Sequence, residues 1–261
     1  MQKTKEMSVI WKQETDSTNL DALRGKMTYG DKTVWAAEYQ SSGRGQRGNV
    51  WKSQRSENLM FSILLKPSCL SAADQFLLSE IASVAMVDYL KTHGILARIK
   101  WPNDVYVSDR KLSGMLIEHT ISGDKVSASI IGIGINVCQC RFDSDIPNPV
   151  SIRQCLEEMG ICNCPLNLKT ELQSYLSFFF RLYDSLNSIS FRQHIHKLYT
   201  ENLYRKDEWH LYQIKSPDGS AVLETIEARI TGVDRETSRL KIWVRGGSER
   251  MYAFKEITYI I

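Results

Sequence analysis

The chain has 261 residues, of which 43% are hydrophobic and 24% are charged, and its formal net charge is +3 at pH 7. This composition is typical of a globular protein and excludes disorder along the whole chain. So small a net charge gives no indication of nucleic-acid binding. No apolar run reaches the roughly 18 residues of a membrane span, and residues 1–7 are polar, unlike a signal peptide. We therefore expect a cytoplasmic protein with no membrane contact.

The hydrophobic pattern predicts mixed strands and helices up to about residue 200. The clearest helix is 74–92, which has apolar residues at helical spacing. In chain order the predicted elements are a strand at 9–11, a helix at 20–26, a strand at 33–38, a polar Gly-rich loop at 39–57, a strand at 58–66, the helix at 74–92, strands at 97–100, 105–107, 111–119 and 126–137, and helices at 151–159, 168–186 and 191–199.

The pattern changes near Lys206, where short alternating strands separated by turns take over. These strands are predicted at 209–214, 221–231, 239–244 and 250–254. The predicted fold class is α+β with an antiparallel sheet, followed by a small β-barrel. We place the division so that residues 1–205 form the first domain and residues 206–261 form the second.

The six cysteines do not predict a zinc site. Four of them form two Cys-x-Cys pairs, whereas structural zinc sites use Cys-x-x-Cys spacing. The five histidines lie in unrelated contexts and suggest no Ser-His-Asp arrangement. Free thiols and structural or exposed histidines are the expected outcome.

Residues Gly43 to Gly48 combine three glycines with two arginines. Glycines let the backbone approach a ligand closely, and arginines match the geometry of carboxylates and phosphates. Such a loop can wrap an anionic ligand, although an ordinary solvated basic loop has the same composition. It is not a P-loop, because Gly-Lys-Ser/Thr is absent.

Three further segments place polar groups at strand ends. Lys100 to Asp104 (Lys-Trp-Pro-Asn-Asp) predicts a site or an ordinary turn with a half-buried tryptophan. Lys111 opens a strand, where it can neutralise a carboxylate and a phosphate together, and Gly114 lets a ligand approach the sheet. Asn136 follows a glycine-containing strand and can hydrogen-bond an adenine edge. A solvated lysine, a bulge glycine and core packing are the plainer alternatives.

Together these segments resemble the biotin–protein ligases, also called biotin–[acetyl-CoA-carboxylase] ligases. The resemblance covers about Val9 to Ile152 and rests on five motifs in the family's order and spacing. They are Ser17-Thr18-Asn19, the loop Gly43 to Trp51, Lys100 to Asp104, Lys111 to Gly114, and Gly134-Ile135-Asn136.

The resemblance implies a catalytic domain like that of class II tRNA synthetases and lipoate ligases, with a mixed or antiparallel sheet, and a C-terminal SH3-like β-barrel. It implies two half-reactions with ATP and Mg²⁺. Biotin is first activated to biotinyl-5′-AMP and then transferred to a lysine of a biotin carboxyl carrier protein or domain. We expect this chain to be a monomer or a homodimer.

The resemblance also implies roles for individual residues. Those expected to bind biotin are Ser17, Thr18, Asn19, Gln40, Gly43, Arg44, Gly45, Gln46, Lys111 and Gly114. Those expected to bind ATP or the adenylate are Arg44, Arg47, Trp51, Lys100, Asn103, Lys111 and Asn136. Those expected to act in catalysis are Lys111, Arg44, Arg47, Lys100 and Asp104; no metal ligand is assigned.

The roles of two residues, Gln46 and Asp104, stay open. Gln46 stands where the family usually has arginine, so its share in holding the adenylate is in doubt, and Arg47 beside it is a candidate to compensate. Asp104 has three candidate roles: accepting the proton of the acceptor lysine, ordering Mg²⁺, or pairing with Lys100 as part of the scaffold.

The alternatives to a biotin ligase are a lipoate–protein ligase of the related fold and a non-catalytic biotin-binding module. Retention of Lys111 and Arg44 argues against the second. Bifunctional members carry a DNA-binding helix-turn-helix domain of about sixty residues before the catalytic core. Here the first motif begins at Asp16, so we expect no DNA binding.

Overall fold

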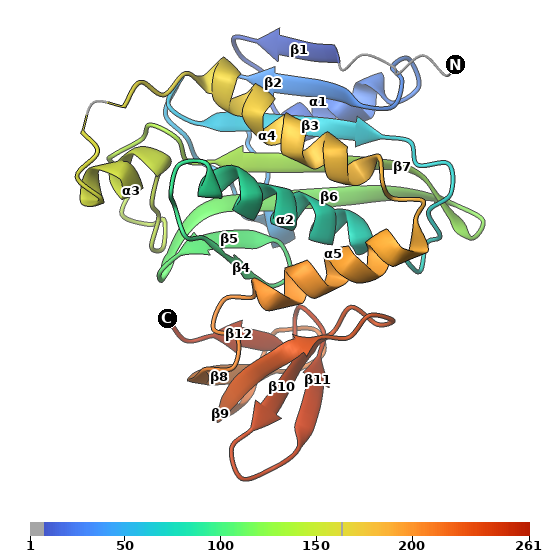
Figure 1. The fold of residues 1–261 in the computed structure, drawn as a ribbon, viewed down its shortest axis with the longest axis vertical. Coiled ribbons are helices and arrows are strands. Elements are labelled where there is room, and N and C mark those ends of the chain that lie inside the picture. Colours follow the sequence, from blue (N-terminus) through green and yellow to red (C-terminus); the bar gives the residue numbers. More distant parts are fainter. Residues whose placement is uncertain (1–7, 163) are drawn as a thin grey trace.

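The computed structural model describes residues 8–162 and 164–261. Its larger part is a seven-stranded sheet in the order β1-β2-β3-β7-β6-β5-β4 (Figure 1). The strands are β1 (Ser8–Lys12), β2 (Thr33–Ala37), β3 (Leu59–Leu65), β4 (Arg98–Lys100), β5 (Asp104–Val107), β6 (Arg110–Ser122) and β7 (Lys125–Ile135). β1 and β2 are parallel and the other neighbours are antiparallel, so the sheet is mixed, and the predicted α+β class is confirmed.

Helices cover both faces of this sheet. They are α1 (Thr18–Gly25), α2 (Leu77–Lys91), α3 (Ile152–Glu158), α4 (Leu168–Tyr183) and α5 (Ile189–Glu201). α2, α4 and α5 lie in front of the sheet in the view of Figure 1, and α1 packs behind it. α2 is buried along nearly its whole length, because it lies between the sheet and the other two front helices.

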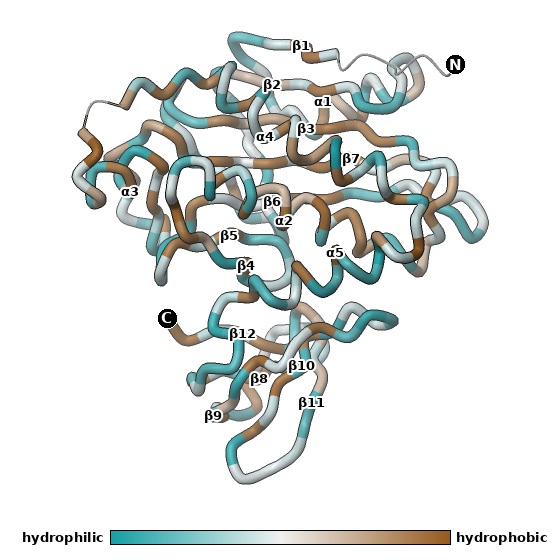
Figure 2. The backbone as a smooth tube through the Cα atoms, in the orientation of Figure 1, coloured by the Kyte–Doolittle hydropathy of each residue, from teal (hydrophilic) through white to brown (hydrophobic). Residues whose placement is uncertain are grey.

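The central strands carry the core. All seven residues of β3 are buried, and so are the last eight of β7. Figure 2 shows hydrophobic residues following these two strands and hydrophilic residues in the outer turns. Burial of apolar surface at about 25 cal/mol per Å² makes this core the main source of stability.

The C-terminal part is a five-stranded antiparallel sheet in the order β11-β10-β9-β8-β12, which fits the predicted SH3-like unit. The strands are β8 (Trp209–Lys215), β9 (Val222–Val233), β10 (Leu240–Val244), β11 (Glu249–Tyr252) and β12 (Ile257–Tyr259). The strand predicted to run to residue 254 ends at Tyr252, and β12 was not predicted. The domain division at residues 205 and 206 stays a prediction.

Trp101 joins the two parts. Its indole Nε1 donates a hydrogen bond to the Ser238 carbonyl oxygen at 3.2 Å, and its ring meets Phe254 edge-on at 5.8 Å between centroids. The side chain is buried, whereas the plainer of the two alternatives had it half-buried, and turns of the C-terminal part at Ser238 and Phe254 contact it.

The structure also bears on the cysteines and on membrane-spanning helices, for the residues that it describes. All six cysteines are free thiols. Within residues 8–162 and 164–261, no helix combines the length and apolar character needed to cross a bilayer.

Candidate active site

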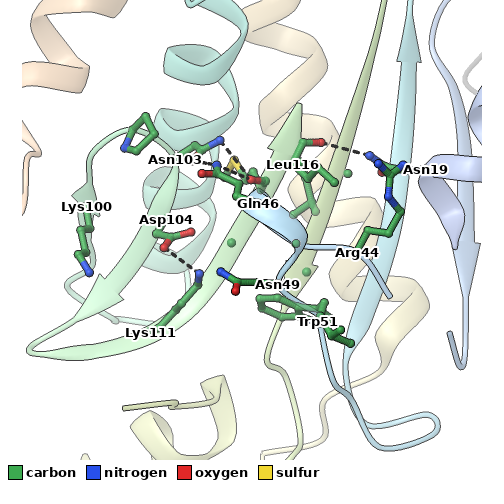
Figure 3. Close-up of a pocket in the computed structure, with 18 of the residues that line it drawn as sticks. Asn19, Arg44, Gln46, Asn49, Trp51, Lys100, Asn103, Asp104, Lys111 and Leu116 are labelled. Carbon is green, nitrogen blue, oxygen red and sulfur yellow. Dashed lines mark hydrogen bonds and ion pairs between the residues drawn. The ribbon is translucent and has the colours of Figure 1, made fainter. Parts of the chain in front are cut away.

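A cavity of about 410 Å³ is lined by residues of the larger sheet and of the C-terminal part. Figure 3 shows the side formed by the larger sheet and the loop before it. The cavity gathers predicted residues from four of the five motifs, together with Gln40. The predicted residues that line it are Ser17, Thr18, Asn19, Gln40, Arg44, Gly45, Gln46, Trp51, Lys100, Asn103, Asp104, Lys111 and Gly114. Segments more than 90 residues apart in the chain therefore meet at one place.

Three predicted residues are not among the side chains that line this cavity. Gly43 is joined to the lining residue Trp51, whose N–H donates to the Gly43 carbonyl oxygen at 3.0 Å. Asn136 lines an adjoining cavity. Arg47 belongs to the short 3₁₀ helix η1 (Gln46–Gly48), and its side chain lies outside what the structure describes.

One end of the cavity is a polar wall at the start of α1. The Thr18 backbone N–H and hydroxyl both donate to Gln40 Oε1, at 2.7 and 3.1 Å. Ser62 on β3 donates to Thr18 Oγ1 at 2.8 Å and lies 2.6 Å from Asn19 Oδ1. Sequence reasoning missed Ser62, because a serine inside an apolar strand has no motif to mark it.

Arg44 lies at the mouth of this end and pairs with Glu118 at 3.2 Å. Glu118 also accepts from Asn19 Nδ2 at 2.8 Å, so it connects the loop to the polar wall. Arg44 and Glu118 are 42% and 39% exposed, and because solvent screens an exposed pair, little free energy opposes turning the guanidinium toward an anionic ligand. Glu118 was also missed; only its place on the Lys111 strand pointed to it.

Gln46 fastens the glycine–arginine loop across the cavity. Its side-chain amide donates to Asn103 Oδ1 and to the Met115 carbonyl oxygen, the second at 3.1 Å. Asn103 donates to the same carbonyl at 3.1 Å. A neutral side chain therefore holds the loop, at the position where the resemblance implies an arginine.

Lys111 and Asp104 face each other on neighbouring strands β6 and β5 (Figure 3). Lys111 Nζ lies 2.7 Å from Asp104 Oδ2. The pair is about 30% exposed, so it faces the cavity while remaining partly shielded from water. Lys111 Nζ also lies 5.9 Å from the centre of a Trp51 ring.

Lys100 sits at the rim toward the C-terminal sheet. Its Nζ donates to the Tyr106 hydroxyl at 3.1 Å and lies over the rings of Tyr106 and Tyr259, at 4.7 and 5.1 Å from their centres. Burial lowers the pKa of Lys100 to about 8. Pairing with Lys100 was one of three candidate roles for Asp104; the carboxylate instead pairs with Lys111.

Three glycines make room for the site's side chains. A Cβ at Gly114 would collide with the Lys111 side chain, one at Gly132 with the Asn19 amide, and one at Gly134 with the Trp51 ring. Gly114 and Gly134 are direct partners across β6 and β7. The floor of the cavity is therefore bare backbone.

A second cavity of about 520 Å³ adjoins the first and shares Trp51 and Lys111 with it. Asn136 lines it, and its Nδ2 donates to the Val150 carbonyl oxygen at 3.1 Å. Among the described residues, the buried Trp51 Nε1 has no hydrogen-bond partner. A buried, unsatisfied donor between two cavities is a feature that a ligand can satisfy.

The C-terminal sheet completes the first cavity. Its contributing residues are Phe254, Ile257, Thr258 and Tyr259. None was predicted, because this region contains no motif. As for metals, the described residues contain no group of three or more His, Cys, Asp or Glu side chains placed to hold an ion.

Comparison with known proteins agrees with this geometry. Residues 9–136 match the biotin/lipoate A/B protein ligase family. The bifunctional ligase/repressor BirA of Salmonella typhimurium is 39% identical over 150 residues, which cover 56% of this chain and 45% of BirA. The biotin–[acetyl-CoA-carboxylase] ligase of Paracoccus denitrificans is 38% identical over 128 residues, covering 47% of this chain and 52% of that protein. The matches thus span about half the length of these relatives.

The fold matches over nearly the whole chain. The Aquifex aeolicus biotin protein ligase, solved in complex with biotin and ATP, superposes with a TM-score of 0.75 and 24% identity, covering 96% of this chain and 97% of that one. This likeness confirms the predicted catalytic fold with its small C-terminal sheet. Over residues 9–136, just under half of its length, the chain is similar to the biotin/lipoate A/B protein ligase family.

Proposed function

We propose that this protein is a biotin–protein ligase. It activates biotin with ATP to biotinyl-5′-AMP and transfers the biotin to a lysine of a biotin carboxyl carrier protein or domain. We further propose that it works in the cytoplasm, as a monomer or homodimer. The observation that carries the proposal is the arrangement of the first cavity. Polar groups of Thr18 and Gln40 form one end, the Lys111–Asp104 pair lies further along, and Trp51 lies between this cavity and the second one.

The first cavity favours one orientation of biotin, with the ureido ring at the Thr18 end and the carboxylate toward Lys111. The ureido ring needs donors and acceptors together, and Thr18 and Gln40 in the cavity wall carry both, with buried Ser62 hydrogen-bonded to Thr18 behind them. The carboxylate of biotin, at the other end, would then lie toward Lys111. Gln46 holds the loop over the ligand, and Arg44 would turn from Glu118 toward the anionic adenylate.

ATP would occupy the second cavity, with its adenine against Trp51 and beside Asn136, and its α-phosphate near Lys111. Mg²⁺ would enter as part of the MgATP substrate; binding through substrate phosphates is its usual mode. Lys100 at the rim would face the outer phosphates, and Arg47 stays a candidate for the same role.

The first half-reaction needs no base, because a carboxylate is already ionised at pH 7. It needs alignment and a cation between two anions, which Lys111 provides. Asp104 fixes the position of that cation. This pair with Lys111 supports a positioning role that was not among the three roles considered for Asp104. Proton acceptance and Mg²⁺ ordering by Asp104 stay predictions.

Exchange of labelled pyrophosphate into ATP tests the proposal. We expect exchange that depends on biotin and is absent with lipoate. Exchange with lipoate alone would indicate a lipoate ligase. Tight biotin binding with no exchange would indicate a non-catalytic binding module.

A further inference from the structure

The two lysines that line the first cavity differ in their partners. Lys111 forms an ion pair with Asp104 at 2.7 Å. Lys100 has no carboxylate within 4.0 Å among the described residues; its polar partner is the Tyr106 hydroxyl at 3.1 Å. Tyrosine rings of β5 and β12 flank its Nζ.

The surroundings of Lys100 tolerate both of its protonation states. Burial lowers its pKa to about 8, nearby Asp104 raises it, and Lys111 and Arg205 lower it. Burial raises the pKa of Tyr106, so its hydroxyl keeps its proton. A hydroxyl accepts a hydrogen bond from an ammonium and donates one to a neutral amine. Lys100 is therefore satisfied with or without its extra proton.

The transfer half-reaction requires such a group. The acceptor lysine is an ammonium at pH 7, with an ordinary pKa of about 10.4, and only its neutral amine can attack. Asp104 is occupied by Lys111. Resting on the function proposed above, we propose that Lys100 accepts the proton of the incoming acceptor lysine.

The step balances as follows. The acceptor ammonium gives one proton to the neutral Lys100 amine. The freed amine attacks the carbonyl carbon of biotinyl-AMP, forming the C–N bond, while the C–O bond to the phosphate breaks and its electron pair leaves with AMP. The nitrogen loses its second proton to solvent as the amide forms.

The same lysine serves the first half-reaction in its charged form. Bound phosphates favour the ammonium, because an opposite charge nearby raises the pKa of a lysine. When pyrophosphate leaves, that stabilisation ends and the pKa returns toward about 8. Release of the first product thereby prepares the base for the second step.

Lys100→Arg tests the proposal, because arginine keeps the charge but does not release its proton. Enzyme is loaded with synthetic biotinyl-AMP. Single-turnover transfer is then measured between pH 6 and 9.5, to a carrier domain and, separately, to hydroxylamine, which is neutral at pH 7 and needs no base. Wild-type transfer to the carrier should rise with pH and level off near 8. In Lys100→Arg it should fall about 10²–10⁴-fold and keep rising beyond pH 8.

The hydroxylamine reaction separates this role from others. It should fall far less than transfer to the carrier, which also shows that the variant folds and holds the adenylate. Equal losses with both nucleophiles, or an unchanged bend near pH 8 in Lys100→Arg, would overturn the proposal. Lys66→Arg is the matched control, because Lys66 is a half-buried lysine outside the cavity that donates to the Tyr29 carbonyl oxygen. Absence of biotin-dependent pyrophosphate exchange in the wild type would instead contradict the proposed function.

Discussion

Lys111 Nζ and Asp104 Oδ2 lie 2.7 Å apart across the β5–β6 pair. Bare backbone at Gly114 leaves space for this pair, because a side chain there would collide with Lys111. The pair is thus built from two strands and one glycine, and each component can be altered separately.

Lys111→Ala should remove most adenylate formation while the fold remains. Loss of one cation from between two reacting anions costs about 2–4 kcal/mol in the transition state, or roughly 10²–10³ in rate. Pyrophosphate exchange measures the effect, and circular dichroism checks the fold. Lys91→Ala is the control, because Lys91 forms a similar pair with Asp88 on the α2 surface. Near-normal exchange in Lys111→Ala would rule out its role.

Asp104→Asn should slow both half-reactions to a similar extent, since both depend on a correctly placed Lys111. The two steps are measured apart, as pyrophosphate exchange and as transfer from preformed biotinyl-AMP. If transfer falls far more than exchange, Asp104 is the base, and Lys100 is not.

Gln46→Ala should loosen the loop from Gln40 to Trp51. It removes bonds to Asn103 and to the Met115 carbonyl oxygen, each with a net contribution of about 0.5–1.5 kcal/mol. Proteolysis within the loop should speed up in the free enzyme and slow again when biotinyl-AMP is added. Ser41→Ala in the same loop should behave as wild type; equal cleavage of both variants would show that Gln46 does not hold the loop.

Gly134→Ala and Gly132→Ala should each weaken the binding of a different ligand. The first displaces the Trp51 ring and the second the Asn19 amide. Overpacking of this kind costs about 1–3 kcal/mol. We expect Gly134→Ala to weaken ATP binding and change tryptophan fluorescence, and Gly132→Ala to weaken biotin binding. Calorimetric titrations showing the same loss for both ligands in both variants would contradict this division.

Lys100→Met should be more stable than the wild type at pH 7. The folded-state pKa of Lys100, about 8, lies below the ordinary value of 10.5, so the folded wild type bears the full cost of a buried ammonium below pH 8. Between pH 8 and 10.5 the unfolded chain binds more protons, and the wild type gains stability relative to the variant. Urea unfolding should show an advantage of about 1–3 kcal/mol at pH 7 that shrinks by pH 9.5. A difference independent of pH would contradict the shifted pKa.

Most of the strands and helices could be predicted from the sequence because their apolar patterns are long. β3, β7 and α2 bury almost every residue, and such segments are recognisable without context. The predicted helix at 74–92 begins only at Leu77, because Ser71 and Asp74 hydrogen-bond each other in a turn before it. β12 has three residues, too few to show a period.

The site was predicted only where chemistry is concentrated in short motifs. Ser62 and Glu118 reach the polar wall through the sheet register, which no local pattern records. Tyr259 reaches Lys100 because the C-terminal sheet folds back over the larger one. Contacts of that kind depend on tertiary structure, and an isolated segment does not reveal them.

The bare backbone at Gly114, Gly132 and Gly134, which forms the cavity floor, limits the substitutions by which ligand specificity could change. Every substitution at these positions adds volume where Lys111, Asn19 or Trp51 already stands. New specificity must therefore come from the walls, where side chains such as Gln40 and Met115 can be exchanged for others. In a saturation-mutagenesis library selected for an altered biotin analogue, the floor should stay glycine while the walls diversify.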